Sequence, residues 1–512
     1  MKKRIFVTAL SLSLATIPFG SADLRAENTS SLAGNTDVAV AHGLASQAAA
    51  TPLAVRGAVR AQPLSARVDP RMELFAIVFR LAGNPEYNMV RVPAYDAALD
   101  AHFGPHADHP AVEMARSLRA VRGVGYDAVM SLAIHVTDVE SLELSAPLES
   151  PGLTLDARWP RARIPEFLKR VREFRRDADV AGFLAAQAPF YAELERQMQE
   201  VLDQHADVGW FERFFGEAPA GGFEVVLSPA AGGGNYGPRF IAPDGHKTVY
   251  AIMGVWQTDE AGLPRIGRHV IPTLVHEFSH SFVNHNVDAH RTELADAGKA
   301  IYPLVEPLMK QQAYGTWMTM LYEALVRAAT ARYVLADQGE EAARRVVLTE
   351  QVRGFIAMDE LYELLGEYEA DRARYPTLAS FMPRFVDWLN ELAPRAESVR
   401  DAFDASRPQV ISTQPADGDA GIDAEAIDTI VLKWDRPMAP SLQINPIPGS
   451  HGHADPDIHD EEWSDDGLTL VLHVRLRPGS NYGLLFNMPF GGAFRCTAGI
   501  PAFMHTLRFS TR

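Results

Sequence analysis

The sequence holds a single cysteine, Cys496, among its 512 residues. An intramolecular disulfide is therefore impossible, and an exported chain of this kind has to rely on an apolar core or a bound metal. Positive charge is also scarce, because 48 lysines and arginines stand against 65 aspartates and glutamates, for a net charge of −17. This balance argues against nucleic acid and anionic membrane surfaces as partners. Beyond the N-terminus, no apolar run is long enough for a transmembrane segment.

Residues 1–22 have the pattern of a secretory signal peptide: a basic start, an apolar stretch too short to span a bilayer, and small residues for cleavage. Ala26 offers a second cleavage position. No cysteine lies near either position, which excludes a bacterial lipoprotein anchor. We therefore expect an exported protein, periplasmic or secreted. The Ala-rich residues 23–66 predict a flexible linker or a pro-segment.

Helical periodicity dominates the region that follows. Apolar residues recur at helical spacing over 69–81, 111–119, 126–134, 164–205 (interrupted near 178–179), 316–333, 353–366 and 379–393. Two short β-type runs, 223–227 and 247–256, flank the glycine-rich stretch 232–237 and predict a small sheet. The glycines alone predict no more than a turn between strands.

His276 to His280 reads HEFSH, an H-E-x-x-H box. Residues four apart share one face of a helix, so His276 and His280 can bind one metal ion, with Glu277 beside them as a base. The flanking residues have the apolar density of a buried helix over about 267–285. Two imidazoles and a carboxylate would be costly in such a helix without a partner. The pattern predicts a Zn²⁺ site.

A hydrolytic zinc site takes a third protein ligand and keeps one position for water. The metzincin form of the box would need a glycine at Val283 and a histidine at Asn286, so that form is excluded. In gluzincins a glutamate on a later helix supplies the ligand, and Glu323 is our choice. It lies on an otherwise apolar helix, where a carboxylate needs a partner.

Other interpretations of this carboxylate stay open. Arg327, four residues beyond Glu323, could form a structural ion pair with it, or could orient it toward the metal. Glu293, in a polar stretch, and Glu306, flanked by two prolines, are less favoured ligands.

Five segments carry a family resemblance: ELFAIVFRLAGNPEYN at 73–88, GVGYDAV at 123–129, GGNYG at 233–237, HEFSHSFVN at 276–284 and YEALVRA at 322–328. Through them, residues 67–400 resemble an uncharacterised family of exported bacterial proteins with a domain of unknown function, assigned to the gluzincin-like peptidases. The resemblance implies a zinc protease fold with His276, His280 and Glu323 as ligands, and it implies no substrate.

Past residue 408, short alternating strands are separated by Pro, Gly and Asp turns. PADG at 415–418, WDRPM at 434–438 and LRPGSNY at 476–482 resemble bacterial Ig-like domains, which implies contact with a cell surface or another protein. We therefore predict an α+β chain: a mostly helical zincin-type metallopeptidase domain with a small mixed sheet at 67–400, then an all-β Ig-like sandwich at 408–512. The stretch 451–462 predicts a solvated acidic loop.

The predicted activity is zinc-dependent hydrolysis of peptide bonds in a peptide or protein substrate. Glu277 would take a proton from the zinc-bound water and pass it to the leaving amine. A further donor has to stabilise the oxyanion. Tyr236, in the glycine loop, is our first candidate for that donor, and the other candidates are Tyr302, Tyr314 and His290.

The alternative is a non-catalytic surface or periplasmic binding protein with a structural or degenerate metal site and an Ig-like adhesion module. A fourth protein ligand from His285 or Asp288 would favour this alternative, because structural zinc sites are closed. The intact Glu277 argues against it, since a structural site has no use for a base.

Overall fold

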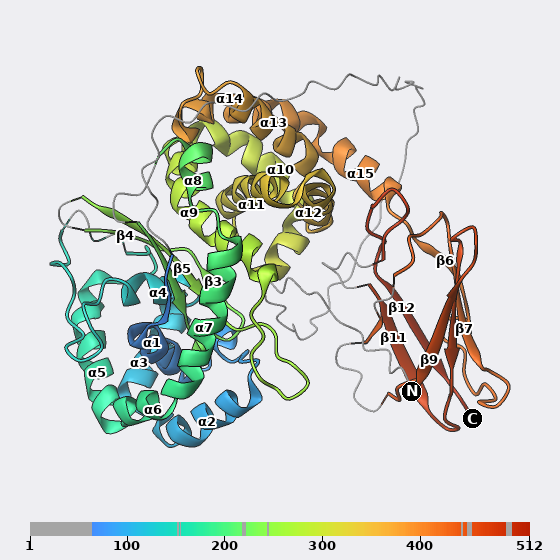
Figure 1. Cartoon of the computed structure of the whole chain (residues 1–512), viewed down its shortest axis with the longest axis horizontal. Coiled ribbons are helices and arrows are strands. Elements are labelled where there is room, and N and C mark those ends of the chain that lie inside the picture. Colours follow the sequence, from blue (N-terminus) through green and yellow to red (C-terminus); the bar gives the residue numbers. More distant parts are fainter. Residues whose placement is uncertain are drawn as a thin grey trace.

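The computed structural model describes residues 64–512, apart from gaps at 151–152, 154, 218–221, 243–244, 442–443, 448–452 and 488–493. The predicted signal peptide and nearly all of the predicted linker lie outside the described residues. Within the described part, no helix is both long and apolar enough to cross a membrane. The class is α+β, as predicted, with one core under helices and a small sheet and a second core among strands alone (Figure 1).

The helical part precedes and follows the first sheet. Its helices are α1 (Pro70–Leu81), α2 (Pro93–Phe103), α3 (Pro110–Arg122), α4 (Asp127–Ala133), α5 (Ile164–Asp177), α6 (Val180–Ala186), α7 (Ala188–His205), α8 (Gly209–Phe215), α9 (Ile271–Ala289), α10 (Arg291–Gln311), α11 (Trp317–Gln338), α12 (Glu340–Val352), α13 (Met358–Ala370), α14 (Leu378–Leu392) and α15 (Ala396–Ser406). Several helices begin at a proline in the first turn, where the missing N–H leaves no hydrogen bond unmade.

The first sheet is mixed. Its strands are β1 (Ala66–Val68), β2 (Phe223–Leu227), β3 (Asn235–Tyr236), β4 (Arg239–Ile241) and β5 (Lys247–Met253), in the order β1-β2-β5-β3, with β4 also paired to β5. β1, β2 and β5 run parallel, whereas β3 and β4 run antiparallel to β5. Since β3 and β4 pair with different ends of β5, they form one interrupted edge of the sheet.

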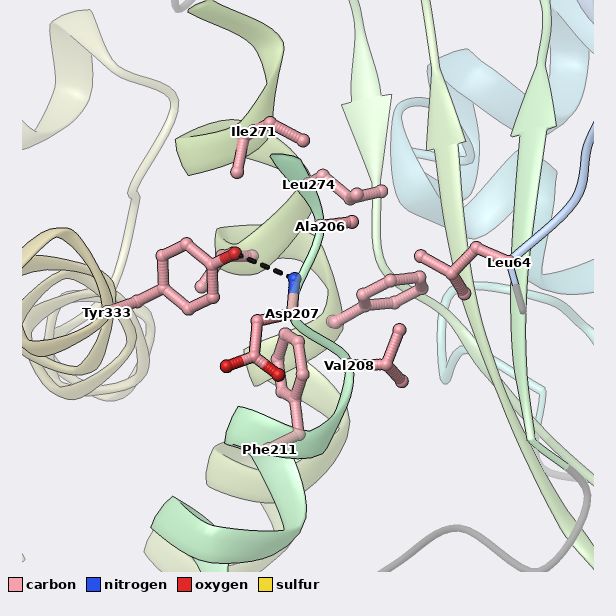
Figure 2. A pocket seen from close by; sticks show the side chains of 10 residues that line it. Leu64, Ala206, Asp207, Val208, Phe211, Ile271, Leu274 and Tyr333 are labelled. Atoms are coloured by element: carbon pink, nitrogen blue, oxygen red, sulfur yellow. Dashed lines mark hydrogen bonds between the residues drawn. The ribbon is translucent and has the colours of Figure 1, made fainter. Parts of the chain in front are cut away.

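Helix α9 is the centre of the larger core and packs against β5, α11 and α14. Phe282 stacks on Phe215 of α8 with ring centroids 4.5 Å apart, and Phe278 meets Phe223 of β2 edge-on at 4.8 Å. Figure 2 shows the apolar side of α9, where Ile271 and Leu274 lie beside Ala206 in the segment before α8. The Asp207 backbone N–H donates a hydrogen bond of 3.1 Å to the Tyr333 hydroxyl. The space enclosed there is about 10 Å³, too small for a ligand. This side of α9 is therefore packing surface.

The C-terminal strands form two antiparallel sheets around a separate core. One sheet has the order β6-β7-β10-β9 and the other β12-β11-β8, from β6 (Val410–Gln414), β7 (Thr429–Trp434), β8 (Ile444–Pro446), β9 (Ile458–Trp463), β10 (Thr469–Val474), β11 (Asn481–Phe486) and β12 (His505–Ser510). Trp434 and Phe494 stack in the core, with ring centroids 5.6 Å apart. The Tyr482 hydroxyl accepts a hydrogen bond of 2.6 Å from the Arg477 backbone N–H.

Several local predictions need correction. The segment 164–205 folds as three helices; its predicted interruption is real, because Asp179 has a φ of +43° and caps α6. Part of the stretch 451–462 is the edge strand β9 and not a loop. The buried Leu64 lies before the predicted domain start at 67, and strand β1 begins one residue before that start.

Candidate metal centre

The H-E-x-x-H box lies on α9, and its spacing sets the arrangement of the two histidines. His276 and His280 are one helical turn apart, with ring centroids 4.8 Å apart and ring planes nearly perpendicular. Their Nε2 atoms lie 3.2 Å from each other. Two imidazole nitrogens at this separation, both directed away from the apolar side of the helix, present their lone pairs to a single point.

Helix α11 brings Glu323 to the same point. The Glu323 Oε2 atom lies 3.4 Å from Nε2 of His276, and Oε1 lies 3.4 Å from Nε2 of His280. Helices α9 and α11 pack closely along their lengths, so that this carboxylate from a distant part of the chain reaches the box. His276, His280 and Glu323 form a group whose potential ligand atoms all lie within 4.8 Å of one another.

The donor set fits zinc in both chemistry and size. Zinc bonds to imidazole nitrogen and carboxylate oxygen are about 2.0–2.2 Å long, which places two ligand atoms of a tetrahedral site roughly 3.3–3.5 Å apart. The three contacts here are 3.2, 3.4 and 3.4 Å, and the last two are made by different oxygens of the Glu323 carboxylate. The three residues can therefore hold one Zn²⁺ ion with little rearrangement.

The electrostatics of the site suit the same purpose. Burial lowers the pKa of His276 to about 4, so its ring is neutral at neutral pH and its lone pair is available. Burial alone would raise the pKa of Glu323, but the two imidazoles and the Arg327 guanidinium hold it below its usual range. Glu323 is thus ionised. The pKa of Glu277 lies well above its usual value, because the carboxyl is buried and faces Glu323.

Polar neighbours fix the orientation of the candidate ligands. Nδ1 of His280 lies 3.2 Å from Oδ1 of Asn284, one turn further along α9, which directs the Nε2 lone pair of His280 toward Glu323. The Arg327 guanidinium donates to Oε2 of Glu323 at 3.1 Å and to the Tyr314 hydroxyl at 2.8 Å. It also donates to Glu350 on α12 at 2.7 Å. Arg327 therefore pairs with Glu323, as one interpretation predicts, and its orienting role toward a metal stays a prediction.

The glycine-rich loop lies directly on the box. A Cβ atom at Gly237 would be 2.0 Å from the carbonyl oxygen of Glu277, so only glycine allows this approach. Because β3 and β4 are the edge of the sheet, this contact fixes the edge beside Glu277. The loop is thus more than a turn between two strands, which was all that its glycines predicted.

Tyr236 lies elsewhere in this loop. Its ring is buried against Tyr87, with centroids 6.4 Å apart, and burial together with Glu86 raises its pKa. Successive residues of a strand face opposite sides, and Gly237 faces α9. Tyr236 therefore faces the other side of the sheet, and its role as oxyanion donor stays a prediction that the geometry does not strengthen.

The other candidate donors have structural partners. The Tyr302 hydroxyl donates to the backbone carbonyl of Tyr314 at 2.9 Å. The Tyr314 hydroxyl accepts from Arg327 and lies beside Glu323. His290 lies 3.7 Å from Glu293 at the start of α10. Among these three residues, only Tyr314 contacts the polar network around the candidate ligands.

The rival ligands lie outside the group. Glu293 pairs with His290, Glu306 pairs with Lys310, and Asp288 accepts hydrogen bonds from Tyr322 and Arg291. His285 is also outside the group of potential ligands. Within the described ranges, no fourth histidine, cysteine, aspartate or glutamate joins His276, His280 and Glu323. Among the described residues, the group therefore lacks the fourth protein ligand that closes a structural zinc site.

Comparison with known proteins shows the family. The chain belongs to the family defined by the domain of unknown function DUF4932, whose model matches residues 64–388, and that description assigns no activity. No curated protein matches the sequence. Two solved structures are similar: surface layer protein SbsC, domains 1–6 (17% identity over 47% of this chain and 33% of that chain), and S-layer protein rSbsC(31–844) (12%, 78% and 45%), each with a TM-score of 0.16. The chain spans less than half the length of either, and these TM-scores carry no argument.

Proposed function

We propose that this DUF4932 protein is a zinc-dependent metallopeptidase of the gluzincin type that hydrolyses peptide bonds. One observation carries the proposal: two imidazole nitrogens and one carboxylate converge at the spacing of a zinc site, beside a buried glutamate and with no fourth protein ligand among the described residues. A structural zinc would be closed by a fourth ligand and would gain nothing from Glu277.

The roles of the residues follow from their positions. His276, His280 and Glu323 would hold the ion. Bound zinc lowers the pKa of a water ligand toward ~7 and polarises a carbonyl group. Glu277 is the base: its carboxyl is buried and its pKa is raised, so it can take a proton from the attacking water and return it to the leaving amine.

The sheet edge supplies a place for the substrate. β3 and β4 lie at the edge beside α9, and an extended peptide can add to such an edge through backbone hydrogen bonds. The close approach of Gly237 to the Glu277 backbone would keep that peptide at a fixed distance from the base. Endopeptidase and exopeptidase action are both compatible with this edge.

The C-terminal sheets support the proposal of an Ig-like domain. Two antiparallel sheets around one core, with a Tyr482 hydroxyl bonded to the backbone five residues upstream, are typical of Ig-like sandwiches and their tyrosine corner. We propose that residues 408–512 form such a domain on an exported, periplasmic or secreted, enzyme. Its role would be contact with a cell surface or another protein.

Metal analysis and peptide hydrolysis test the function together. The purified wild type should contain one zinc per chain and should cleave an unfolded protein such as casein. Glu277→Gln should retain the zinc and lose hydrolysis by at least 10³-fold, on the order of the loss expected when a base and its electrostatic role are removed together. Glu260→Gln, an exposed change on the loop before α9, is the control and should behave as wild type.

Two results would reject the proposal. A wild type that binds no zinc under metal-replete conditions would remove the metal centre, and full activity of Glu277→Gln would remove the mechanism. A wild type that holds zinc and cleaves no peptide in a broad library would favour the non-catalytic binding protein.

A further inference from the structure

The carboxylate of Glu323 is the first member of a buried row of alternating charges. Its Oε2 atom accepts from Arg327, whose Nη1 donates to Glu350 at 2.7 Å, and Arg353 donates to the other oxygen of Glu350 at 2.8 Å. The four side chains are 8, 3, 8 and 4% exposed, in that order. Charged side chains are rarely buried to this extent unless they are paired.

Within this row, Arg327 is bound more closely by Glu350 than by Glu323. The contact to Glu350 is 2.7 Å and the contact to Glu323 is 3.1 Å. The Nη2 atom of Arg327, which donates to Glu323, also donates to the Tyr314 hydroxyl. The centroid of the Phe355 ring lies 4.8 Å from Cζ of Arg327. Arg327 is therefore fixed in place by groups that do not belong to the candidate ligand set.

Both oxygens of Glu350 are occupied by arginines, so this residue has no free group for a metal or a substrate. It lies on α12, which packs along α11. The side chain of Gln312 donates to the backbone carbonyl of Arg353 at 2.8 Å and ties the end of the row to α10. The hydrogen-bond path from Glu350 to Glu323 thus runs through Arg327.

We propose that Glu350 is a positioning residue of the metal centre, which holds Arg327 so that Glu323 keeps its orientation and its negative charge for the ion. This inference rests on the proposed zinc site. Arg327 and Arg353 carry two positive charges, and Glu323 and Glu350 carry two negative charges. Removing the negative charge of Glu350 leaves an excess positive charge beside the proposed zinc position. The same change frees Arg327 to bind Glu323 more tightly.

The test measures zinc binding and not turnover. Zinc affinity is determined by competition with a chromophoric chelator, and the visible absorption of the Co²⁺-loaded protein reports the geometry of the ligands. Glu350→Gln should bind zinc about 10–100-fold more weakly, the usual effect of removing a group that orients a metal ligand. Its Co²⁺ spectrum should change in intensity and position.

Matched variants separate positioning from general damage. Glu341→Gln lies on the same helix, but its carboxylate is 90% exposed and pairs with Arg345 at the surface, so zinc affinity and spectrum should stay as in wild type. Glu350→Asp keeps the charge and should recover part of the affinity. Tyr314→Phe removes one hydrogen bond to Arg327, leaves no charge unpaired, and should weaken zinc binding by a smaller factor.

The outcomes are distinguishable. Wild-type zinc affinity and Co²⁺ spectrum in Glu350→Gln would overturn the role of Glu350 and leave the metallopeptidase proposal standing. A wild type without zinc would reject the proposed function itself. If Glu350→Gln does not fold, Tyr314→Phe decides, because an unchanged affinity and spectrum in that folded variant would also overturn the inference.

Discussion

Gly237 is the position at which one added methyl group tests how the sheet edge holds the candidate base. The residue lies between β3 and β4, and a Cβ there would be 2.0 Å from the Glu277 carbonyl oxygen and 2.8 Å from the carbonyl carbon. Both atoms belong to the backbone of α9. They cannot rotate away as a side chain would, so Gly237→Ala has to push the strand and the helix apart.

The size of the effect follows from these distances. Non-bonded heavy atoms reach a favourable contact at roughly 3.5 Å, so the separation at Gly237 has to grow by on the order of 1 Å. A displacement of about 1 Å at a catalytic group typically costs ~10²-fold in rate. Overpacking of this kind also lowers the free energy of unfolding by about 1–3 kcal/mol. We expect both losses in Gly237→Ala.

A neighbouring glycine provides the control. A Cβ at Gly233 would have its nearest neighbour at 4.0 Å, the Cδ1 atom of Trp256, so Gly233→Ala should retain activity and stability. The assay compares the rate of peptide hydrolysis and the urea unfolding of wild type and both variants. Wild-type rate and stability in Gly237→Ala would refute the argument, and so would equal losses in the two variants.

Two further predictions concern pH and the orientation of a ligand. The Glu73 carboxyl is fully buried and accepts hydrogen bonds from Ser228, Ala230, Tyr95 and Tyr191. Burial raises its pKa from 4.5 to about 7. Because the folded protein holds this proton more tightly, its contribution to stability is complete below about pH 4.5 and is lost as the pH rises to about 7, a change on the order of 3 kcal/mol. Glu73→Gln should remove that part of the slope in urea unfolding between pH 5 and 8; equal slopes in both proteins would contradict the assignment. Asn284→Ala removes the partner of the His280 Nδ1 atom and should weaken zinc binding by about 10-fold or more in chelator competition, whereas an unchanged affinity would show that packing alone orients the ring.

The fold was predictable where each element carried its own signal. Strand β2 has the predicted bounds, and the start of β5 matches as well. Helix α10 was missed because Pro303 and Pro307 suggest an interruption, yet both lie on the exposed side of the helix, four residues apart. Helix α12 was missed because much of its buried face is Ala342, Ala343 and the ionised Glu350, which give little apolar periodicity.

The candidate site also has one part that the sequence predicts and one part that it does not. His276, Glu277 and His280 lie within five residues, so helical spacing alone brings them together. The orientation of Tyr236 could not be predicted, because it depends on which side of an interrupted edge strand each residue faces. A shift of one residue exchanges the two faces of a strand. The close approach of Gly237 to the Glu277 backbone indicates which side of the strand faces α9. No local sequence pattern predicts that approach.

Glu323 was a reasonable choice from sequence because a carboxylate on an apolar helix needs a partner, but Arg327 could have been that partner in full. The hydrogen bonds show that Arg327 is shared between Glu323 and Glu350. An arginine that served Glu323 alone would neutralise it and leave nothing for a metal. Arg327 instead divides its charge between Glu323 and Glu350, with the shorter contact to Glu350. Glu323 therefore retains negative charge on the side that faces the two imidazoles, which is what a ligand to a dication requires.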